Sequence, residues 1–173
     1  NNIAYPNSPL FINEWMAANT HTIQDPVNGK FEDWFELYNA GPTAVDLSGY
    51  TLSNNTNTPG QFVIPTGFSV PANGFLLVWA DKNSSQNNPA TSPDLHISFN
   101  LSKAGETIGL YAPNGTNIDL IQFGSQTNDI SQGRWPDANS GPFVFMTTPT
   151  PQQPNVYGSS ANTPPVLATI GPR

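Results

Sequence analysis

The chain has 173 residues, of which 12 are Asp or Glu and 5 are Lys or Arg, so its formal net charge is −7. This acidic balance disfavours contact with the phosphates of DNA, RNA or anionic lipids, and we expect no nucleic-acid partner. The chain has no cysteine, which excludes disulfides, thiolate metal ligands and a cysteine nucleophile.

Short apolar runs bounded by turn residues follow one another along the chain and are typical of β-strands. β-branched and aromatic residues dominate these runs, and no segment has a convincing helical period. The expected strands cover residues 10–17, 31–39, 50–54, 61–65, 75–80, 95–101, 107–112, 118–124 and 142–146.

The turns between these runs also favour a β fold. The sequence PNGTN predicts a hairpin between 107–112 and 118–124, because Asn114 and Gly115 readily adopt the positive φ angles of a tight reversal. The segment NLSKAGETIGLY could begin with one helical turn, but Gly105 favours a tight turn. The sequence therefore predicts an all-β fold, an immunoglobulin-like antiparallel β-sandwich of about eight or nine strands.

Composition divides the chain into three parts. Residues 1–9 form a lead-in, residues 10–150 hold the expected strands, and residues 151–173 are rich in Pro, Ser and Asn. Proline removes ladder donors and small polar residues resist packing, so we expect residues 151–173 to be an extended tail or linker toward a following domain.

The chain also lacks the sequence features of a membrane or leader segment. No apolar run of about 18 residues and no Lys-led hydrophobic leader is present, so we expect neither membrane insertion nor a signal peptide. Asn, Thr, Ser, Gly and Pro dominate between the apolar runs, a composition typical of secreted β-rich modules. We therefore expect a piece of a longer exported protein, located extracellularly or at the cell surface.

Several segments, in one order along the chain, resemble the bacterial branch of the lamin tail domain family. They are INEWMAAN, DWFELYNAG, VDLSGYTLSN, VPANGFLLVWAD, LSKAGETIGLY, IDLIQFGSQTNDISQGRWPD and TPTPQQPN. The resemblance implies an immunoglobulin-like sandwich and a non-catalytic module of secreted or cell-surface proteins. The related domain of animal nuclear lamins contacts proteins and, through a basic surface, DNA. The acidic charge of this chain argues against that DNA role.

The end of the chain carries a second resemblance. The sequence NTPPVLATIGPR resembles the opening strand of cadherin-like or immunoglobulin-like repeats in large bacterial surface proteins. We therefore expect neighbouring domains in the same chain.

Residues that could support catalysis are few. His21 and His96 are the two candidate general bases, and no serine lies in a Gly-x-Ser-x-Gly elbow. A glycosidase could pair Glu36 with Asp33 or Glu14, but carboxylates on one surface of a strand are common. We therefore expect no enzyme and no cofactor.

A calcium site is a sharper alternative, and it would make the chain a calcium-stabilised adhesion domain. Hard cations need several oxygen ligands, and one loop could offer them together with backbone carbonyls. The candidate ligands are Asn19, Asp25, Asn28, Glu32 and Asp33. The same residues are also common in turns, and no EF-hand pattern is present, so ordinary turn chemistry is the favoured interpretation.

The segment FEDWFELYNAG predicts a central strand with two different faces. By the two-residue repeat, Phe35 and Leu37 share one face, which we expect to meet the core. Trp34, Glu36 and Tyr38 share the other face and are candidate ligand-binding residues on an exposed surface.

The first expected strand raises a question about a carboxylate. The same repeat places Glu14 on one face with Leu10, Ile12 and Met16. A carboxylate at the rim of the core needs hydrogen-bond donors, so we expect Glu14 and Glu36 to accept hydrogen bonds from turns or neighbouring strands.

Aromatic residues leave a glycan-binding alternative open. Trp15, Trp34 and Trp135 could form an exposed platform for sugar rings, whereas Trp79 is expected in the core or at its inner rim. Arg134 is expected to tie a long loop by charge-assisted hydrogen bonds. The favoured function is a structural or protein-interaction module, and glycan binding is the alternative.

Overall fold

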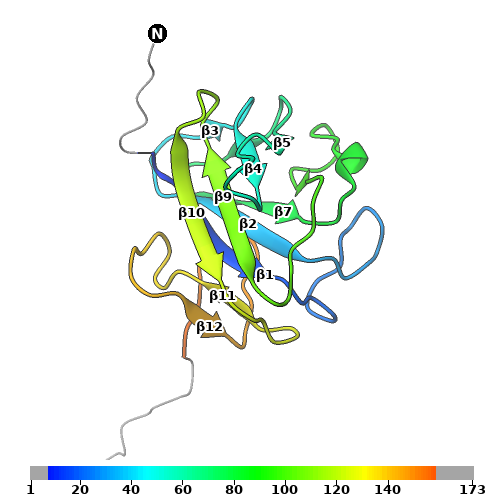
Figure 1. Ribbon diagram of the computed structural model, residues 1–173, viewed down its shortest axis with the longest axis vertical. Helices are drawn as coiled ribbons and strands as arrows, with labels where there is room; N and C mark the ends of the chain where they lie inside the picture. Colours follow the sequence, from blue (N-terminus) through cyan, green and yellow to red (C-terminus); the bar gives the residue numbers. More distant parts are fainter. Residues whose placement is uncertain (1–7, 159–173) are drawn as a thin grey trace, which may run out of the picture.

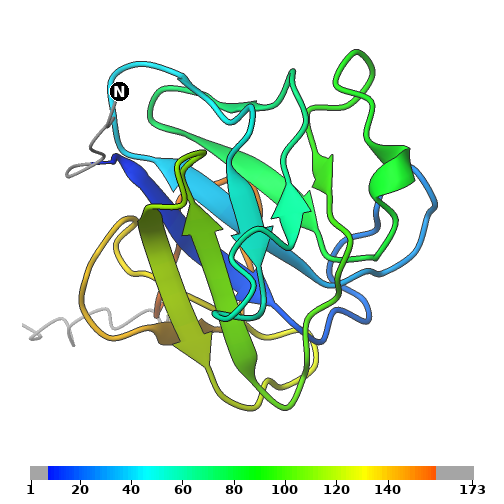
Figure 2. The same cartoon turned by 45° about the horizontal axis from the view of Figure 1, so that its top comes forward.

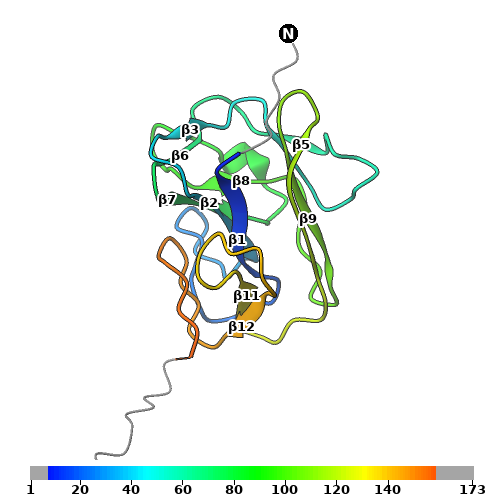
Figure 3. The ribbon, with the colours of Figure 1, turned by 90° about the vertical axis from the view of Figure 1, so that its left-hand side faces the viewer.

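The computed structural model describes residues 8–158, and two β-sheets packed face to face form the centre of this part (Figures 1 and 3). One sheet, named the β2 sheet after a central strand, has this strand order: β12 (Val144–Met146), β11 (Ser131–Gly133), β1 (Leu10–Met16), β2 (Trp34–Asn39), β7 (Gly74–Trp79) and β8 (Leu95–His96). Its neighbours pair antiparallel, except that β7 and β8 are parallel.

The second sheet, named the β9 sheet, covers one face of the first. Its strand order is β10 (Asn117–Phe123), β9 (Glu106–Tyr111), β4 (Thr51–Ser53) and β5 (Phe62–Val63). A short ladder joins β3 (Val45–Asp46) to β6 (Ser69–Val70), and one 3-10 turn, η1, covers Ser84–Gln86. Figure 2 shows the β9–β10 hairpin lying over β1 and β2.

The main core lies between the two sheets. Phe35 and Leu37 are fully buried in it, which confirms the inward face predicted for β2. The core side chains from the strands are Leu10, Ile12, Trp15, Phe35, Leu37, Leu76, Val78 and Leu95 from the β2 sheet, and Leu52, Phe62, Ile108, Leu110, Ile121 and Phe123 from the β9 sheet. Their burial on both inner faces is the packing expected of a β-sandwich.

The outer face of the β2 sheet is covered as well. Met16, Trp34, Leu77 and Trp79 form a second buried cluster, against which Ile23 from the loop between β1 and β2 packs. The β2 sheet is therefore buried on both faces at this point, unlike a sheet that presents one face to solvent.

A β-bulge at Asn13 changes which residues of β1 share a face. Ile12 pairs with Leu37, whereas Glu14 pairs with Glu36, and the register shifts between these two pairs. An extra residue in one strand reverses the alternation beyond it. The prediction that Glu14 shares the core face of Ile12 was therefore wrong, and Glu14 lies on the outer face of the β2 sheet.

The predicted hairpin between β9 and β10 is confirmed, with a different loop. The amide of Gly115 donates to the carbonyl oxygen of Ala112 at 2.8 Å, and that of Ala112 donates to Thr116 at 2.8 Å. Gly115 has a φ of 83°, whereas Asn114 is not among the residues with positive φ. The loop is thus a type I turn followed by a glycine bulge rather than a two-residue reversal.

The structure confirms the all-β, immunoglobulin-like sandwich. Each of the nine segments predicted as strands overlaps a strand of the structure, and Gly105 lies in a tight turn with a φ of 110°. Within residues 8–158 there are twelve strands, and the three that the sequence did not predict are β3, β6 and β11. No helix in this part of the chain is long and apolar enough to span a membrane.

The sequence assigned residue 150 to the end of the sandwich and residues 151–155 to the tail, yet Thr150, Gln152 and Asn155 all hydrogen-bond to the sandwich. The backbone amide of Gln152 donates to Glu36, and the side chain of Asn155 is buried. These contacts form because the buried carboxylates on the outer face of the β2 sheet need hydrogen-bond donors, and the amides of this segment supply them. The lead-in before residue 8 and the tail after residue 158 lie outside the described residues.

Candidate interaction surface

The outward residues of β2 do not form an exposed surface. Trp34 and Glu36 are each 0% exposed, and Tyr38 is half-buried beside Phe75, with ring centroids 4.8 Å apart. The prediction of an exposed surface was therefore wrong for Trp34 and Glu36. The physical reason is that other segments cover the outer face of the sheet, as the cluster around Trp34 shows.

Glu14 and Glu36 form a buried carboxylate pair, supplied with donors by the chain itself. Thr150 donates to Glu14 through its amide at 3.0 Å and its hydroxyl at 3.0 Å. The amide of Gln152 donates to Glu36 at 2.8 Å, and Asn13 Nδ2 donates at 3.1 Å. These bonds confirm that the two carboxylates accept from turns and neighbouring strands.

Burial shifts the titration of this pair. Loss of solvent raises the pKa of Glu14, and it holds the pKa of Glu36 well above its usual range, where the charge of Glu14 adds to the effect. Because both side chains are 0% exposed, neither reaches solvent where a substrate could bind. The pair is part of the fold and does not have the geometry of a glycosidase site.

The three candidate tryptophans do not form one platform. Trp15 is 0% exposed and meets Phe143 edge-on, with ring centroids 4.9 Å apart at an interplanar angle of 87°. Trp34 is buried in the second cluster. Trp135 is 45% exposed. The expected exposed strip was therefore wrong for Trp15 and Trp34, because their rings fill the two faces of the β2 sheet.

Trp135 instead belongs to a surface that sequence reasoning did not identify as a whole. Its ring lies 5.6 Å from that of Tyr157, at an interplanar angle of 56°. Tyr157, Val156 and Phe145 are also about half exposed. We name Trp135, Phe145, Val156 and Tyr157 the C-terminal aromatic surface. These four are half of the eight large hydrophobic side chains that are exposed within residues 8–158.

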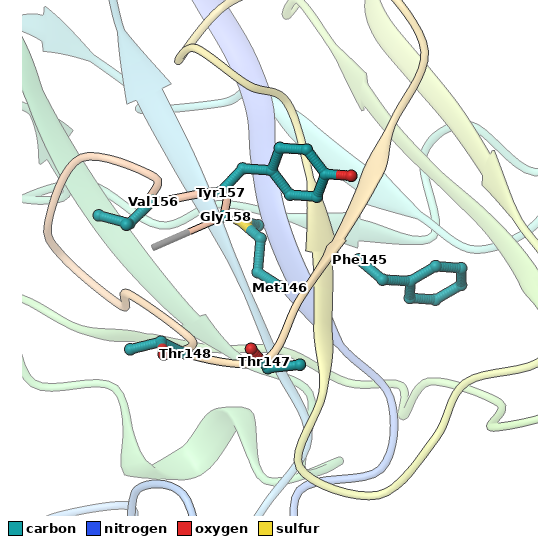
Figure 4. A pocket seen from close by; sticks show the side chains of 7 residues that line it. All are labelled: Phe145, Met146, Thr147, Thr148, Val156, Tyr157 and Gly158. Carbon is teal, nitrogen blue, oxygen red and sulfur yellow. The ribbon is translucent and has the colours of Figure 1, made fainter. Parts of the chain in front are cut away.

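A pocket of about 460 Å³ lies within this surface. Figure 4 shows it between the end of β12, with the residues that follow, and the returning segment 156–158. Phe145, Met146, Val156 and Tyr157 supply apolar walls, and Thr147 and Thr148 supply hydroxyl groups; Gly158 completes the lining. The pocket therefore offers hydrogen-bonding groups beside apolar contacts.

Arg134 precedes Trp135 in sequence, and its guanidinium group anchors this part of the chain to neighbouring segments. Its Nη2 donates to both oxygens of Asp119 at 3.0 and 2.9 Å, and its Nε donates to the carbonyl oxygen of Ile12 at 2.9 Å. Nη1 donates to the carbonyl oxygen of Asn139 at 2.7 Å. These bonds confirm that Arg134 ties the long loop by charge-assisted hydrogen bonds, and they fix the backbone next to Trp135.

Asn155 fixes the other end of the surface. Its Nδ2 donates to the carbonyl oxygens of Arg134 at 2.6 Å and Asn13 at 3.2 Å. Its backbone amide donates to Asp137 at 2.9 Å. The exposed Val156 and Tyr157 therefore follow directly after an anchored residue. Binding residues on a fixed base lose less conformational entropy on contact with a partner.

The candidate calcium ligands are mostly engaged in local turn bonds. Asn19 Oδ1 accepts from the amide of Thr22, Asn28 Oδ1 accepts from Lys30, and Asp33 Oδ1 accepts from Asn19. Burial raises the pKa of Asp33 to about 6. The carboxylates of Asp25, Glu32 and Asp33 do not converge within the described residues. Asp25 lies instead with Asp81 and His96.

Sequence carried one signal for the C-terminal aromatic surface. Val156 and Tyr157 are an apolar pair within a run of Pro, Asn, Gln and Ser, and they follow the resemblance segment TPTPQQPN. The domain boundary at residue 150 was drawn from composition and left this pair in the tail. A proline-rich composition indicates that a segment forms no strand, but such a segment can still pack against the sandwich.

Comparison with protein families matches one model to most of the chain. The model of the Lamin Tail Domain matches residues 4–125. No curated protein matches the chain. The match ends before β11 and β12, so the C-terminal aromatic surface lies beyond the matched residues.

Proposed function

Since the chain belongs to the lamin tail domain family, whose members are non-enzymatic immunoglobulin-like domains, we propose that it is a protein-interaction module of a multidomain protein. The observation that carries this proposal is the C-terminal aromatic surface, where Trp135, Phe145, Val156 and Tyr157 are each about half exposed. Contiguous exposed apolar groups on a soluble domain are typical of interaction sites.

The residue types favour a protein partner. Trp, Tyr and Phe are enriched in protein interfaces, and Trp and Tyr often contribute most of the binding energy. The rings of Trp135 and Tyr157 are inclined by 56°, so they do not form one flat platform of the kind that stacks on a sugar ring. A protein partner fits this shape better, because its apolar side chains can contact the two inclined rings and enter the neighbouring pocket.

The composition supports an extracellular or cell-surface location. The chain is acidic and only 10% charged, and its polar residues are mostly amides and hydroxyls. In this proposal the domain is one of several domains of an exported protein, and it binds a partner protein so that the partner lies close to the other domains. We propose no catalytic role for Glu14 and Glu36, because both carboxylates are buried and accept hydrogen bonds from the chain itself.

Affinity capture with the purified protein tests this function. The bait is the protein itself, exposed to the extracellular fraction of the source organism, and the bound proteins are identified by mass spectrometry. A double variant, Phe145→Ser with Tyr157→Ser, should lose at least about tenfold of the captured partner, since both residues line the pocket. Val63→Ser is the matched control, because Val63 is 58% exposed on β5, in the other sheet.

The alternative outcomes are distinct. Capture of the same proteins by the double variant and by the wild type contradicts the proposal. A parallel glycan array separates the second class of ligand: saturable binding to glycans that is lost in the double variant, with no captured protein, would replace the protein partner by a glycan.

A further inference from the structure

Asp25, Asp81 and His96 bring three potential metal ligands together in one buried cluster. Their ligand atoms all lie within 4.8 Å of one another. The three residues come from separate segments. Asp25 lies in the loop between β1 and β2, Asp81 lies two residues after the end of β7, and His96 lies in β8. We propose that these three side chains bind one divalent transition-metal ion of the zinc class, which has a structural role.

Among residues 8–158, one carboxylate oxygen of Asp25 has no hydrogen-bond partner. Its side chain is 0% exposed, and Oδ2 is buried without a hydrogen bond in the described part of the chain. Oδ2 points at the cluster, 4.0 Å from His96 Nδ1. A buried carboxylate oxygen without a donor is costly, whereas a cation between Asp25 and Asp81 would satisfy both carboxylates at once.

A hydrogen bond at His96 Nδ1 cannot satisfy both carboxylates. Nδ1 lies 3.0 Å from Asp81 Oδ2, a normal hydrogen-bond distance, and 4.0 Å from Asp25 Oδ2, which is too long. The other ring nitrogen, Nε2, is buried and has no partner within residues 8–158. An imidazole that binds a metal through Nδ1 keeps its proton on Nε2.

Hydrogen bonds around the cluster orient all three side chains. Each aspartate uses Oδ1 to accept from the amide two residues ahead, Asp25 from Val27 at 2.8 Å and Asp81 from Asn83 at 2.9 Å. Each Oδ2 is thereby left to face the cluster. The Asn87 side chain bonds both the amide and the carbonyl of His96. Such supporting bonds typically fix the ligands of a metal site.

The ligand types decide the class of ion. One imidazole nitrogen and two carboxylate oxygens suit zinc and related divalent ions, whereas calcium prefers six or more oxygen ligands. Ligand atoms of a tetrahedral zinc ion lie roughly 3.3 Å apart, given metal–ligand bonds of about 2.0 to 2.1 Å. The distances of 3.0 and 4.0 Å bracket this value. Small side-chain shifts would complete the geometry.

The position of the cluster favours a structural ion. The side chains of Asp25, Asp81 and His96 are each at most 1% exposed, so a substrate has no access. An ion here would link the β1–β2 loop to the end of β7 and to β8. It would hold the same loop whose Ile23 covers the second buried cluster.

Thermal unfolding and calorimetry of the untagged protein test the proposal. The protein is stripped with a chelator and then titrated with Zn²⁺, Ca²⁺ or Mg²⁺. We expect one Zn²⁺ per chain and a rise in Tm of roughly 5 to 10 °C when free zinc exceeds Kd a hundredfold. No binding of Zn²⁺ at one site, no rise in Tm, or a rise with Ca²⁺ alone overturns the proposal.

Substitutions assign the site. Asp25→Asn keeps Oδ1 for the amide of Val27 and removes the unpaired carboxylate oxygen, so this variant should fold without metal and bind Zn²⁺ at least about tenfold more weakly. His21→Gln is the matched control for the chain's second histidine, which is exposed and near Asp129. Unchanged zinc binding in Asp25→Asn, or its loss in His21→Gln, overturns the assignment.

Discussion

Glu36 shows at the scale of one residue why alternation along a strand does not predict exposure. The two-residue repeat placed Phe35 and Leu37 inward, and the structure confirms this. It also placed Trp34 and Glu36 outward, yet both are 0% exposed. Alternation separates the two faces of a sheet, but whether a second layer covers the outer face depends on distant segments.

The buried carboxylate pair predicts how stability depends on pH. Because the pKa of Glu36 is raised, the folded protein keeps a proton that the unfolded chain releases above about pH 4.5. The free energy of unfolding should therefore fall as pH rises from the usual pKa of a glutamate toward the raised pKa. Glu36→Gln removes this titration, so the fall should become shallower.

Urea unfolding at a series of pH values between 4 and 8 measures this effect. The matched control is Glu32→Gln, in the β1–β2 loop, where the carboxyl is partly exposed. An unchanged slope in Glu36→Gln would contradict the role assigned to the buried pair, as would an equal change in the control.

At the scale of elements, the close approach of β11 to β1 depends on a glycine. A Cβ atom on Gly133 would lie 2.5 Å from the carbonyl oxygen of Asn13 and 3.0 Å from Glu14 Cα. Both contacts are with backbone, which cannot move without disturbing the ladder. Gly133→Ala should therefore lower the free energy of unfolding by about 1 to 3 kcal/mol.

Gly124→Ala is the control for this prediction. A Cβ there meets nothing within 4 Å, so the change should stay within about 0.5 kcal/mol. Chemical unfolding compares the two variants with the wild type. Equal stability of Gly133→Ala and Gly124→Ala would show that β11 does not pack on β1 as described.

Length and pattern explain which elements the sequence predicted. β1, β2, β7, β9 and β10 are long enough for apolar and β-branched runs to stand out. β3, β6 and β11 have two or three residues each, and Val45–Asp46, Ser69–Val70 and Ser131–Gly133 carry no repeat. Their pairing is decided by tertiary contacts, and so is the bulge at Asn13, which no local signal marks.

At the scale of the whole molecule, the segment after residue 149 completes the sandwich. Thr150 and Gln152 supply backbone donors to Glu14 and Glu36. A chain that ends at Pro149 should be less stable than one that ends at Gly158 by at least about 3 kcal/mol, because it leaves several buried acceptors without donors. Thermal and urea unfolding compare the two chains, and equal stability would contradict this role.

The candidate sites could be predicted only in part, because their residues are far apart in sequence. Trp135 and Asp25 were both singled out from sequence, but with the wrong companions. Tyr157 and Phe145 join Trp135 through the return of the chain across β11 and β12, and His96 and Asp81 join Asp25 through β7 and β8. Such groupings follow from topology, which local patterns do not contain.

In the proposed function, the C-terminal aromatic surface is where this domain meets its partner. Hydrogen–deuterium exchange of the domain, alone and with the captured partner, tests this proposal. We expect slower exchange on binding in residues 143–148 and 155–158, which include Phe145 and Tyr157 at the pocket. Protection confined to β4, β5 and the turn between them, with unchanged exchange around the pocket, would show that the partner binds elsewhere.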